Sequence, residues 1–525
     1  MSNIDRRKFL GVTALGAAAV LAKPLLATAQ DVPAFELDEI TVEQLQEGMR
    51  SGRWTSRGIA QAYLARIDAL DKRTTNAVIE RNPDALAIAG ERDQERKEGR
   101  VRGPLHGIPV LIKDNIDTAD RMRTSAGSLA LAEHIAERDA AVAKRLRDAG
   151  AVILGKTNLS EWANIRSTRS TSGWSARGGL TRNPYALDRN ACGSSSGTGA
   201  AIAANLAAIG IGTETDGSIV CPSSASGLVG IKPTLGLVSR SGIIPISHSQ
   251  DTAGPMARTV RDAAILLGAL TGVDERDPIT MKSRGKVHAD YTPFLDAGGL
   301  KGARIGVARH YFGFNMHVDA IMKEALDALK QQGAILVDPA DMTTAGKYDD
   351  TEFEVLLYEF KADLNEYLKP LKLTLADLIK FNEANRDREM PYFGQEIFEM
   401  AEKKGPLTDA AYKKALAKNH RLSRTEGIDA TLKKHKLDAL VAPTGGPVWP
   451  TDLINGDHFT GGFSTASAVA GYPHITVPAG FAFGLPVGIS FFAGAWSEPT
   501  LLKLAYAFEQ ATKARKGPRF LATVG

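Results

Sequence analysis

The sequence has only two cysteines among 525 residues, and beyond its first 30 residues it has no long apolar run. Two cysteines cannot build a disulfide-stabilised scaffold or a cysteine-based zinc or iron–sulfur framework. The ten histidines form no His-x-x-x-His or His-Glu pair, so the sequence predicts no metal site. No later run reaches the roughly 18 apolar residues that a membrane-spanning helix needs, so we expect no membrane anchor. The remaining possibility is a globular chain long enough to be an enzyme.

An excess of one charge is also lacking. The formal net charge is +4, and residues 1–29 contribute four Lys or Arg side chains against one Asp. The rest of the chain therefore carries a formal charge of only +1. A nucleic-acid-binding protein would keep a basic excess or a basic stripe, so we expect no nucleic-acid partner.

The N-terminus has the order of a secretory signal. Arg6-Arg7-Lys8-Phe9-Leu10 precedes the 12-residue run Gly11–Ala22, and Ala27-Thr28-Ala29 follows as an Ala-x-Ala cleavage site. Twelve residues are too few to span a bilayer. The paired arginines resemble twin-arginine signals of bacteria. We therefore expect a signal peptide over residues 1–29, engagement of the export machinery, and a periplasmic or secreted mature protein.

Alternating strand and helix patterns cover most of the chain. A capping box at Thr41 and Gln44 predicts a first helix, and a second should begin near Ser56. Short apolar runs predict strands at 108–112, 152–154, 209–212, 228–231, 305–307, 335–337, 440–442, 475–477 and 487–491. Uninterrupted apolar strands indicate an α/β fold whose sheet is covered by helices on both faces. Residues 342–435 contain helical patterns without a convincing strand, which predicts a helical insertion in one large domain spanning 30–525.

Glycine and serine are concentrated over residues 173–236. Cys192-Gly193-Ser194-Ser195-Ser196-Gly197 precedes an alanine-rich helix, and Gly212-Thr213-Glu214-Thr215-Asp216-Gly217-Ser218 follows. A segment with so few bulky side chains lets backbone N–H groups approach a ligand closely, as in an oxyanion hole. Upstream, Lys113 ends an apolar strand, where burial would lower its pKa toward neutrality and make it a general base for a serine nucleophile.

These segments resemble the amidase signature family, and among its members the bacterial peptide amidases. The resemblance rests on the Lys113 strand, Gly155–Glu161, the Gly/Ser core, Ser249–Pro255 and Gly484–Gly488, and it extends over residues 40–515. It implies a mixed sheet with helices on both faces, the amidase signature fold. It also implies an enzyme that hydrolyses linear amides through an acyl-enzyme, with no cofactor and no metal.

The resemblance also assigns roles to residues. Ser218 corresponds to the nucleophile, and Ser194, after a non-proline cis peptide bond, corresponds to the serine that relays its proton to Lys113. Together they would form a Ser-Ser-Lys triad. The backbone N–H groups of Thr215, Asp216, Gly217 and Ser218 would form the oxyanion hole. The family often has Gly-Gly-Ser-Ser-Gly-Gly, whereas this chain has Cys192 and Ser196 at the first and fifth positions.

Three other functions fit part of the sequence. Gly193–Gly197 matches the Gly-x-Ser-x-Gly elbow of α/β-hydrolases, which would make Ser195 the nucleophile of an esterase, although no strand is predicted before it. A non-catalytic binding protein would not need Lys113, Ser194 and Ser218. An amidotransferase subunit would not need an export signal.

The substrate is less well defined by the sequence. We expect the substrate to be a peptide amide or a small-molecule amide, and the C-terminal amides of peptides are among the candidates. Aromatic residues of the insertion and of the loop 446–463 suggest a partly hydrophobic acyl pocket, and we single out Phe353, Tyr358, Tyr392, Trp449 and Phe459. Tyr358, Glu359 and Trp162 fit a pocket wall or the core equally well. Cys192 and Cys221 could form a disulfide, although small buried side chains are the more ordinary expectation.

Overall fold

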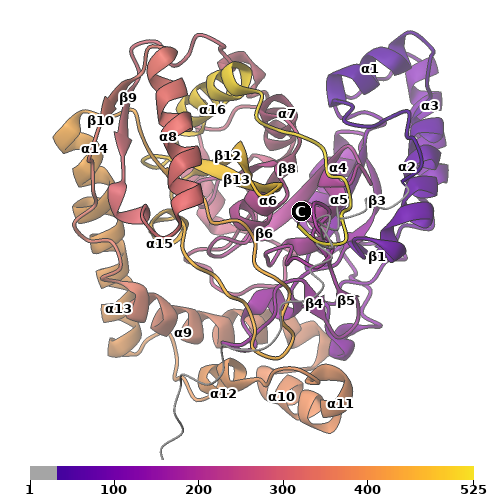
Figure 1. The fold of residues 1–525 in the computed structure, drawn as a ribbon. Helices are drawn as coiled ribbons and strands as arrows, with labels where there is room; N and C mark the ends of the chain where they lie inside the picture. The colour runs from indigo at the N-terminus through magenta and orange to yellow at the C-terminus, as the bar shows by residue number, and fades with distance from the viewer. Residues whose placement is uncertain (1–31, 525) are drawn as a thin grey trace, which may run out of the picture.

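The computed structural model describes residues 32–524. An 11-stranded mixed sheet runs through the molecule in the order β1-β3-β2-β6-β8-β7-β12-β13-β11-β9-β10 (Figure 1). Its strands are β1 Val78–Arg81, β2 Pro109–Lys113, β3 Val152–Thr157, β6 Ile209–Glu214, β7 Val229–Lys232, β8 Thr252–Ala257, β9 Arg304–Val307, β10 Ile335–Val337, β11 Ala439–Pro443, β12 His474–Ala482 and β13 Leu485–Phe492. A separate two-stranded ribbon pairs β4 Trp174–Ser175 with β5 Gly179–Leu180.

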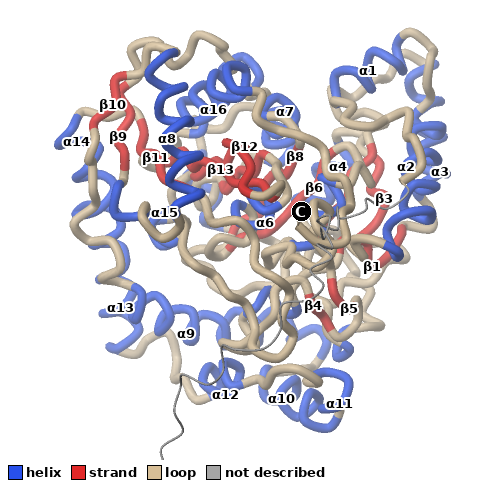
Figure 2. The backbone as a smooth tube through the Cα atoms, viewed as in Figure 1, coloured by secondary structure: helices blue, strands red, loops and turns tan. Residues whose placement is uncertain are grey.

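Helices flank this sheet and confirm the predicted α/β class (Figure 2). They are α1 Val42–Arg50, α2 Ser56–Leu70, α3 Ala85–Lys97, α4 Ala141–Asp148, α5 Ser196–Ala203, α6 Val220–Ala225, α7 Val260–Leu270, α8 Met316–Gln331, α15 Thr465–Ala470 and α16 Glu498–Thr512. The capping box of Thr41 and Gln44 begins α1 as predicted. Within the described residues, no helix is both long and apolar enough to cross a membrane.

The strands predicted from apolar runs are all present, but the apolar runs do not predict β1, β8 or the short ribbon strands β4 and β5. β8 has the sequence Thr-Ala-Gly-Pro-Met-Ala, and its glycine and proline disguise a strand. It is buried along its whole length and pairs antiparallel with both β6 and β7. This segment is a strand because of its cross-strand pairing and burial, which a local sequence pattern does not reveal.

The segment from residue 349 to residue 435 is largely helical, and it contains α9 Asp349–Leu368, α10 Leu375–Ala384, α11 Arg386–Glu389, α12 Glu396–Glu402, α13 Ala410–His420 and α14 Asp429–His435. In Figure 1, α9 to α12 lie along the lower part of the molecule, α13 rises at the left, and α14 lies near β10 at the upper left. The apolar face of α9 enters a second hydrophobic cluster, in which Phe360 and Leu364 are packed with Trp162, Ile244 and Ile246. The insertion therefore packs onto segments next to the Gly/Ser core.

The position of β2 brings two parts of the predicted site together. β2 pairs parallel with β3 on one side and with β6 on the other, and all five of its residues are buried. Ile112 lies opposite Ile211 in this parallel pair, so the C-terminal ends of β2 and β6 lie at the same edge of the sheet. Lys113 therefore lies beside Thr213, although 100 residues separate them in sequence.

Candidate active site

Lys113 has no exposed surface at the end of β2. Its Nζ atom lies 2.7 Å from Ser194 Oγ and 2.8 Å from Thr213 Oγ1, and it also donates to the Thr213 carbonyl at 3.3 Å. Burial lowers the pKa of Lys113 to about 7, against the opposing effect of the negative charges of Asp251 and Glu214. A large fraction of this lysine is therefore uncharged near neutral pH and can accept a proton.

The two central serines of the Gly/Ser core differ in their surroundings. A cis peptide bond joins Gly193 to Ser194, where the family resemblance placed it, and the Ser194 hydroxyl faces Lys113. The Ser195 hydroxyl instead donates to the Thr213 carbonyl at 3.1 Å and accepts from the Thr213 N–H at 3.2 Å. Ser195 is buried and fully engaged with backbone groups.

This arrangement does not support the nucleophile elbow. The residues before Ser195 form turns and bends rather than a strand, and α5 begins only at Ser196. His474, one of the late histidines that an elbow would use, is buried against Ser490, with its Nε2 2.6 Å from the Ser490 hydroxyl. The geometry thus favours Ser194 over Ser195 as the partner of Lys113.

Ser218 lies in the turn that connects β6 to α6. Gly217 precedes it with a φ of 78°, a left-handed conformation that glycine adopts without strain. The Ser195 N–H donates to the Ser218 carbonyl at 3.2 Å, which ties the two serine-bearing segments together. Ser218 is 9% exposed. Within residues 32–524, the N–H groups of Asp216, Gly217 and Ser218 donate to no other protein group.

The segment Thr215–Ser218, here called the oxyanion loop, is fixed at both ends. After it, the Glu214 carboxylate accepts from the N–H groups of Ile219 at 2.7 Å and Val220 at 3.0 Å. At its start, the Thr215 hydroxyl donates to Asp251 at 2.6 Å. Donors that already have a fixed geometry can stabilise a developing oxyanion without reorganising.

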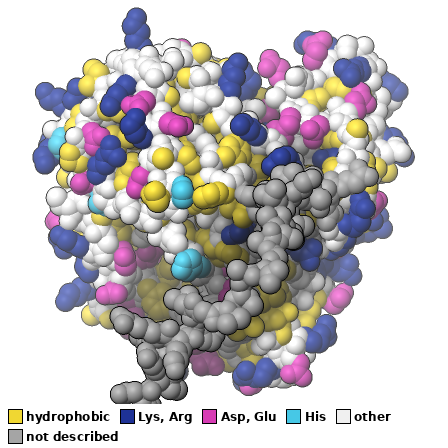
Figure 3. Space-filling view, in the orientation of Figure 1, with side chains coloured by type: hydrophobic (Ala, Val, Ile, Leu, Met, Phe, Trp, Pro, Cys, Tyr) yellow, Lys and Arg dark blue, Asp and Glu magenta, His cyan; other side chains and the backbone are white. Residues whose placement is uncertain are grey.

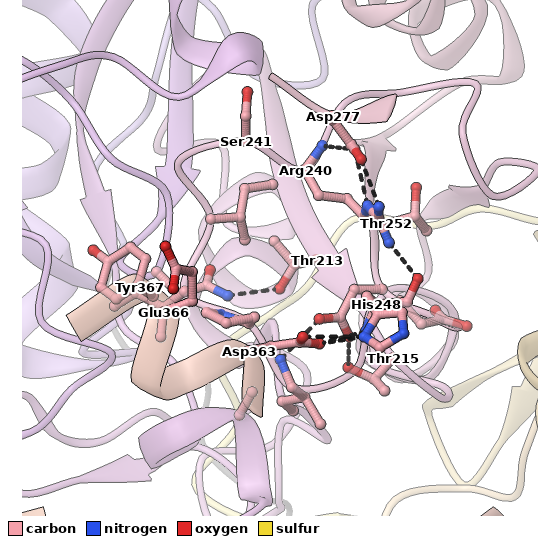
Figure 4. Close-up of a pocket in the computed structure, with 18 of the residues that line it drawn as sticks. Thr213, Thr215, Arg240, Ser241, His248, Thr252, Asp277, Asp363, Glu366 and Tyr367 are labelled. Atoms are coloured by element: carbon pink, nitrogen blue, oxygen red, sulfur yellow. Dashed lines mark hydrogen bonds and ion pairs between the residues drawn. The ribbon is translucent and has the colours of Figure 1, made fainter. Parts of the chain in front are cut away.

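A cavity of about 290 Å³ reaches this site. Its lining includes Ser194, Thr213 and Thr215, while Ser218 lies outside the lining. One wall is apolar and is formed by Ala163, Ile243, Ile244, Pro245 and Ile246. The other lining side chains are polar or charged, and the charged ones come from the end of β6, from the 240–251 and 276–277 segments and from α9 (Figure 4). The cavity can therefore receive a ligand that has both apolar and polar parts.

The charged part of this lining consists of paired groups. The Arg240 side chain donates two hydrogen bonds to the Asp277 carboxylate, from Nε at 2.9 Å and from Nη2 at 2.5 Å. His248 lies with Nδ1 2.9 Å from Asp363 and Nε2 3.3 Å from Glu359. Burial opposes protonation of His248, but the hydrogen bond to Asp363 and the charge of Glu359 outweigh it and raise the pKa of His248. In the space-filling view of Figure 3, basic and acidic side chains are interspersed over the visible face of the molecule.

His248, Glu359 and Asp363 are also the one group of potential metal ligands that lies close enough together among the described residues. Both ring nitrogens of His248 already face carboxylates, and Glu359 accepts hydrogen bonds from the hydroxyls of Ser247 and Tyr412. The arrangement is that of a hydrogen-bonded ion pair. It links α9 to the segment that precedes β8.

Comparison with known proteins decides the family. The family model described as amidase matches residues 58–502. The chain belongs to the amidase family. A solved structure of native peptide amidase from Stenotrophomonas maltophilia is 53% identical, with a TM-score of 0.89, and the match covers 93% of this chain and all of that one.

Two sequence relatives show the breadth of the family. A probable amidase of Arabidopsis thaliana is 42% identical over 501 residues, which cover 93% of each chain. A glutamyl-tRNA(Gln) amidotransferase subunit of Acinetobacter baylyi is 35% identical, over 91% of this chain and 97% of the relative. Together these findings show an enzyme with the amidase signature fold that acts on amides.

The more ordinary expectation for the two cysteines, that they are separate buried side chains, is wrong. A disulfide joins Cys192 to Cys221, with the two Cα atoms 6.0 Å apart. Cys192 lies two residues before Ser194 and Cys221 three residues after Ser218. The bond therefore connects the two serine-bearing segments of the site.

The aromatic residues predicted to form an acyl pocket do not line the cavity that reaches Ser194. Phe353 packs against the second hydrophobic cluster, and the Tyr358 hydroxyl donates to Asp409. Trp449 donates to Asp457 and contacts the ring of the half-exposed Phe459. Tyr392 contacts Trp174. Residue type alone could not show which side of each segment faces the site.

The cavity is lined instead by residues that the sequence did not single out. They are chiefly Asn115, Arg240, Ile243, Ile244, Ile246, His248, Asp363 and Tyr367. Asn115 also donates to Thr213 Oγ1 at 3.0 Å, next to Lys113. Asn115 lies two residues after Lys113, and Asp251 lies within the motif Ser249–Pro255. Their position in family motifs was the one signal in the sequence that could have assigned them to the site.

Proposed function

We propose that this amidase is a peptide amidase that removes the C-terminal amide of peptides through a Ser218–Ser194–Lys113 triad. The observation that carries the proposal is the 2.7 Å contact between Lys113 Nζ and Ser194 Oγ, beside the turn that holds Ser218. The 53% identity to a solved peptide amidase over 93% of the chain supports the choice of substrate class. The cavity, with one apolar wall and a charged rim, suits a peptide end better than a simple aliphatic amide.

The first half of the proposed mechanism forms the acyl-enzyme. Uncharged Lys113 takes a proton from Ser194 as Ser194 takes one from Ser218, and Ser218 Oγ attacks the amide carbonyl carbon. The unengaged N–H groups of the oxyanion loop bind the developing oxyanion, and each such donor contributes about 3–4 kcal/mol in other enzymes. When the tetrahedral intermediate collapses, the C–N bond breaks and the proton returns through Ser194 to the nitrogen, which leaves as ammonia.

The second half releases the acid. Water loses a proton to the same relay and attacks the ester carbonyl of the acyl-enzyme. The bond between Ser218 Oγ and the acyl carbon breaks, the proton returns to Ser218, and the peptide leaves with a free carboxylate. The triad side chains pass one proton from Ser218 to the leaving nitrogen and a second from water back to Ser218, so these steps need no metal or cofactor.

The test is ammonia release from N-protected peptide amides, simple amides and matched esters. We expect peptide amides to be the best substrates. Ser218→Ala should reduce kcat at least ~1,000-fold. Ser195→Ala is the matched control, because Ser195 is a neighbouring buried serine that contacts backbone groups only, and it should keep most of the activity. Ester cleavage lost in Ser195→Ala alone would contradict the triad.

We also propose that the protein is exported to the periplasm by its N-terminal segment. The support is the order of Arg6-Arg7, the apolar run Gly11–Ala22 and the Ala27-Thr28-Ala29 site. These residues lie outside the described part of the structure. An Arg6→Lys/Arg7→Lys variant should accumulate in the cytoplasm in its uncleaved form, and fractionation with immunoblotting would detect it. Equal export of both forms would contradict a twin-arginine route.

A further inference from the structure

Asp251 stands out because it joins the oxyanion loop to a segment outside it. Its Oδ1 accepts from the Thr215 hydroxyl at 2.6 Å. Its Oδ2 accepts from the backbone N–H groups of Ile246 and Ser247, each at 2.8 Å. The carboxylate thus fastens the first residue of the loop to the segment Ile246–Gln250, here called the brace.

The brace holds Thr215 at a second atom. Gln250, the neighbour of Asp251, donates through Nε2 to the Thr215 carbonyl at 3.3 Å and to Glu352 of α9 at 2.8 Å. Thr215 is therefore held by both its side chain and its backbone. Because Thr215 begins the turn that carries the N–H groups of Asp216, Gly217 and Ser218, its position sets theirs.

The brace is in turn held by the helical insertion. Glu359 of α9 has no exposed surface, and its Oε2 accepts from the Ser247 hydroxyl at 2.5 Å and from the Ser249 N–H at 3.0 Å. One turn further along α9, Asp363 accepts from the backbone N–H of His248 at 2.8 Å. Figure 4 shows the side chains of these two residues joined by hydrogen bonds in the lining of the cavity. The brace therefore connects α9 to the oxyanion loop.

We propose that Asp251 is a positioning residue for amide hydrolysis, which holds the oxyanion loop against the α9-supported brace so that its N–H groups fit the transition state. This inference rests on the proposed function of Ser218 as nucleophile. It assigns to Asp251 no contact with the reacting atoms. Hydrogen-bond donors stabilise the transition state only if they are held at the position of the oxyanion, so a loosened loop should lose rate more than substrate affinity.

The test compares two substitutions with opposite predictions. Asp251→Ala removes all three hydrogen bonds and should lower kcat about 100-fold while KM stays within about threefold, a loss comparable to that of one oxyanion-hole donor. Asp251→Asn can keep its carbonyl oxygen on the N–H groups of Ile246 and Ser247 and donate its amide to the Thr215 hydroxyl. It should therefore recover kcat to within about tenfold of the wild type.

Two inhibitors separate positioning from substrate binding. A peptide aldehyde matched to the best substrate can form a hemiacetal with Ser218 that places its oxygen in the oxyanion hole, whereas the corresponding peptide alcohol cannot. For Asp251→Ala, we expect the inhibition constant of the aldehyde to rise about 100-fold and that of the alcohol to change less than about threefold, because transition-state interactions alone are lost. A similar loss for both inhibitors would overturn the proposal.

The matched control is Asp262→Ala on α7. Asp262 is a buried carboxylate that accepts from the Val42 N–H at 3.1 Å, and it does not line the cavity. Asp262→Ala should lower the melting temperature, but it should not lower kcat selectively while KM stays constant. If Asp251→Ala behaves like this control, or raises KM with kcat unchanged, the inference is wrong while the proposed function stands. A wild-type enzyme that cleaves no amide would overturn both proposals.

Discussion

Replacing Lys113 by methionine should remove activity and, at neutral pH, remove a large cost to stability. The pKa of Lys113 falls from 10.5 to about 7 on folding because the side chain is buried. One pKa unit corresponds to about 1.4 kcal/mol. The folded protein therefore gives up about 4 kcal/mol at pH 7 relative to a chain whose lysine stays solvated. Methionine is of similar length, carries no charge and avoids this cost.

The sign and pH range of this effect follow from proton binding. The unfolded chain holds the Lys113 proton up to about pH 10.5, and the folded protein releases it near pH 7. Between these values the unfolded state binds more protons, so the free energy of unfolding of the wild type should rise with pH relative to that of Lys113→Met. Methionine also loses the contacts with Ser194 and Thr213, but the hydroxyl and carbonyl partners do not titrate, so that loss is the same at every pH.

The measurement is the free energy of unfolding of both proteins in denaturant at pH 7, 8, 9 and 10. The difference between the two should move by about 3.5 kcal/mol in favour of the wild type from pH 7 to pH 10. In parallel, kcat/KM of the wild type should fall about tenfold per pH unit below pH 7, as Lys113 becomes protonated. A difference in stability that stays constant over this range would refute the assignment of a buried, neutral Lys113.

Two further predictions concern the elements that hold the site. The double variant Cys192→Ser/Cys221→Ser should lose about 3.5 kcal/mol of unfolding free energy, because the disulfide closes a loop with a sequence separation of 29; two free thiols in denatured, unreduced wild-type protein would show that the bond is absent. His248→Gln should lower the melting temperature more at pH 6 than at pH 9. Burial lowers the pKa of His248, but Asp363 and Glu359 raise it further, so the stabilisation is complete below about pH 6.5 and is lost as pH rises through the raised pKa. Equal losses at both pH values would contradict this explanation.

The family resemblance predicted more of the site residues than local sequence patterns did. Lys113, Ser194 and Ser218 were singled out because they occur in motifs that fix their order along the chain, and the structure brings Lys113 and Ser194 into contact. Their roles in catalysis stay a proposal. The apolar strand patterns also predicted the α/β class, because a buried strand must be apolar on both faces.

Other features were beyond what the sequence shows. The oxyanion loop is held by Asp251 and by Glu214, and no spacing rule predicts that these carboxylates meet the backbone of a turn. The cavity is lined by isoleucines and paired charges, not by the aromatic residues that composition favoured. Composition records which side chains a segment has, but not which of them point inward.

The order of residues supplies the chemical groups of this protein, namely a strand-end lysine, serines in a segment almost free of bulky side chains, and enough apolar residues to bury them. How these groups are placed and charged follows from the folded arrangement. Parallel pairing of β2 with β6 puts Lys113 beside Thr213, and burial there lowers its pKa to about 7. Desolvation and hydrogen-bond geometry depend on groups that are distant in sequence, and they exist only once the chain has folded.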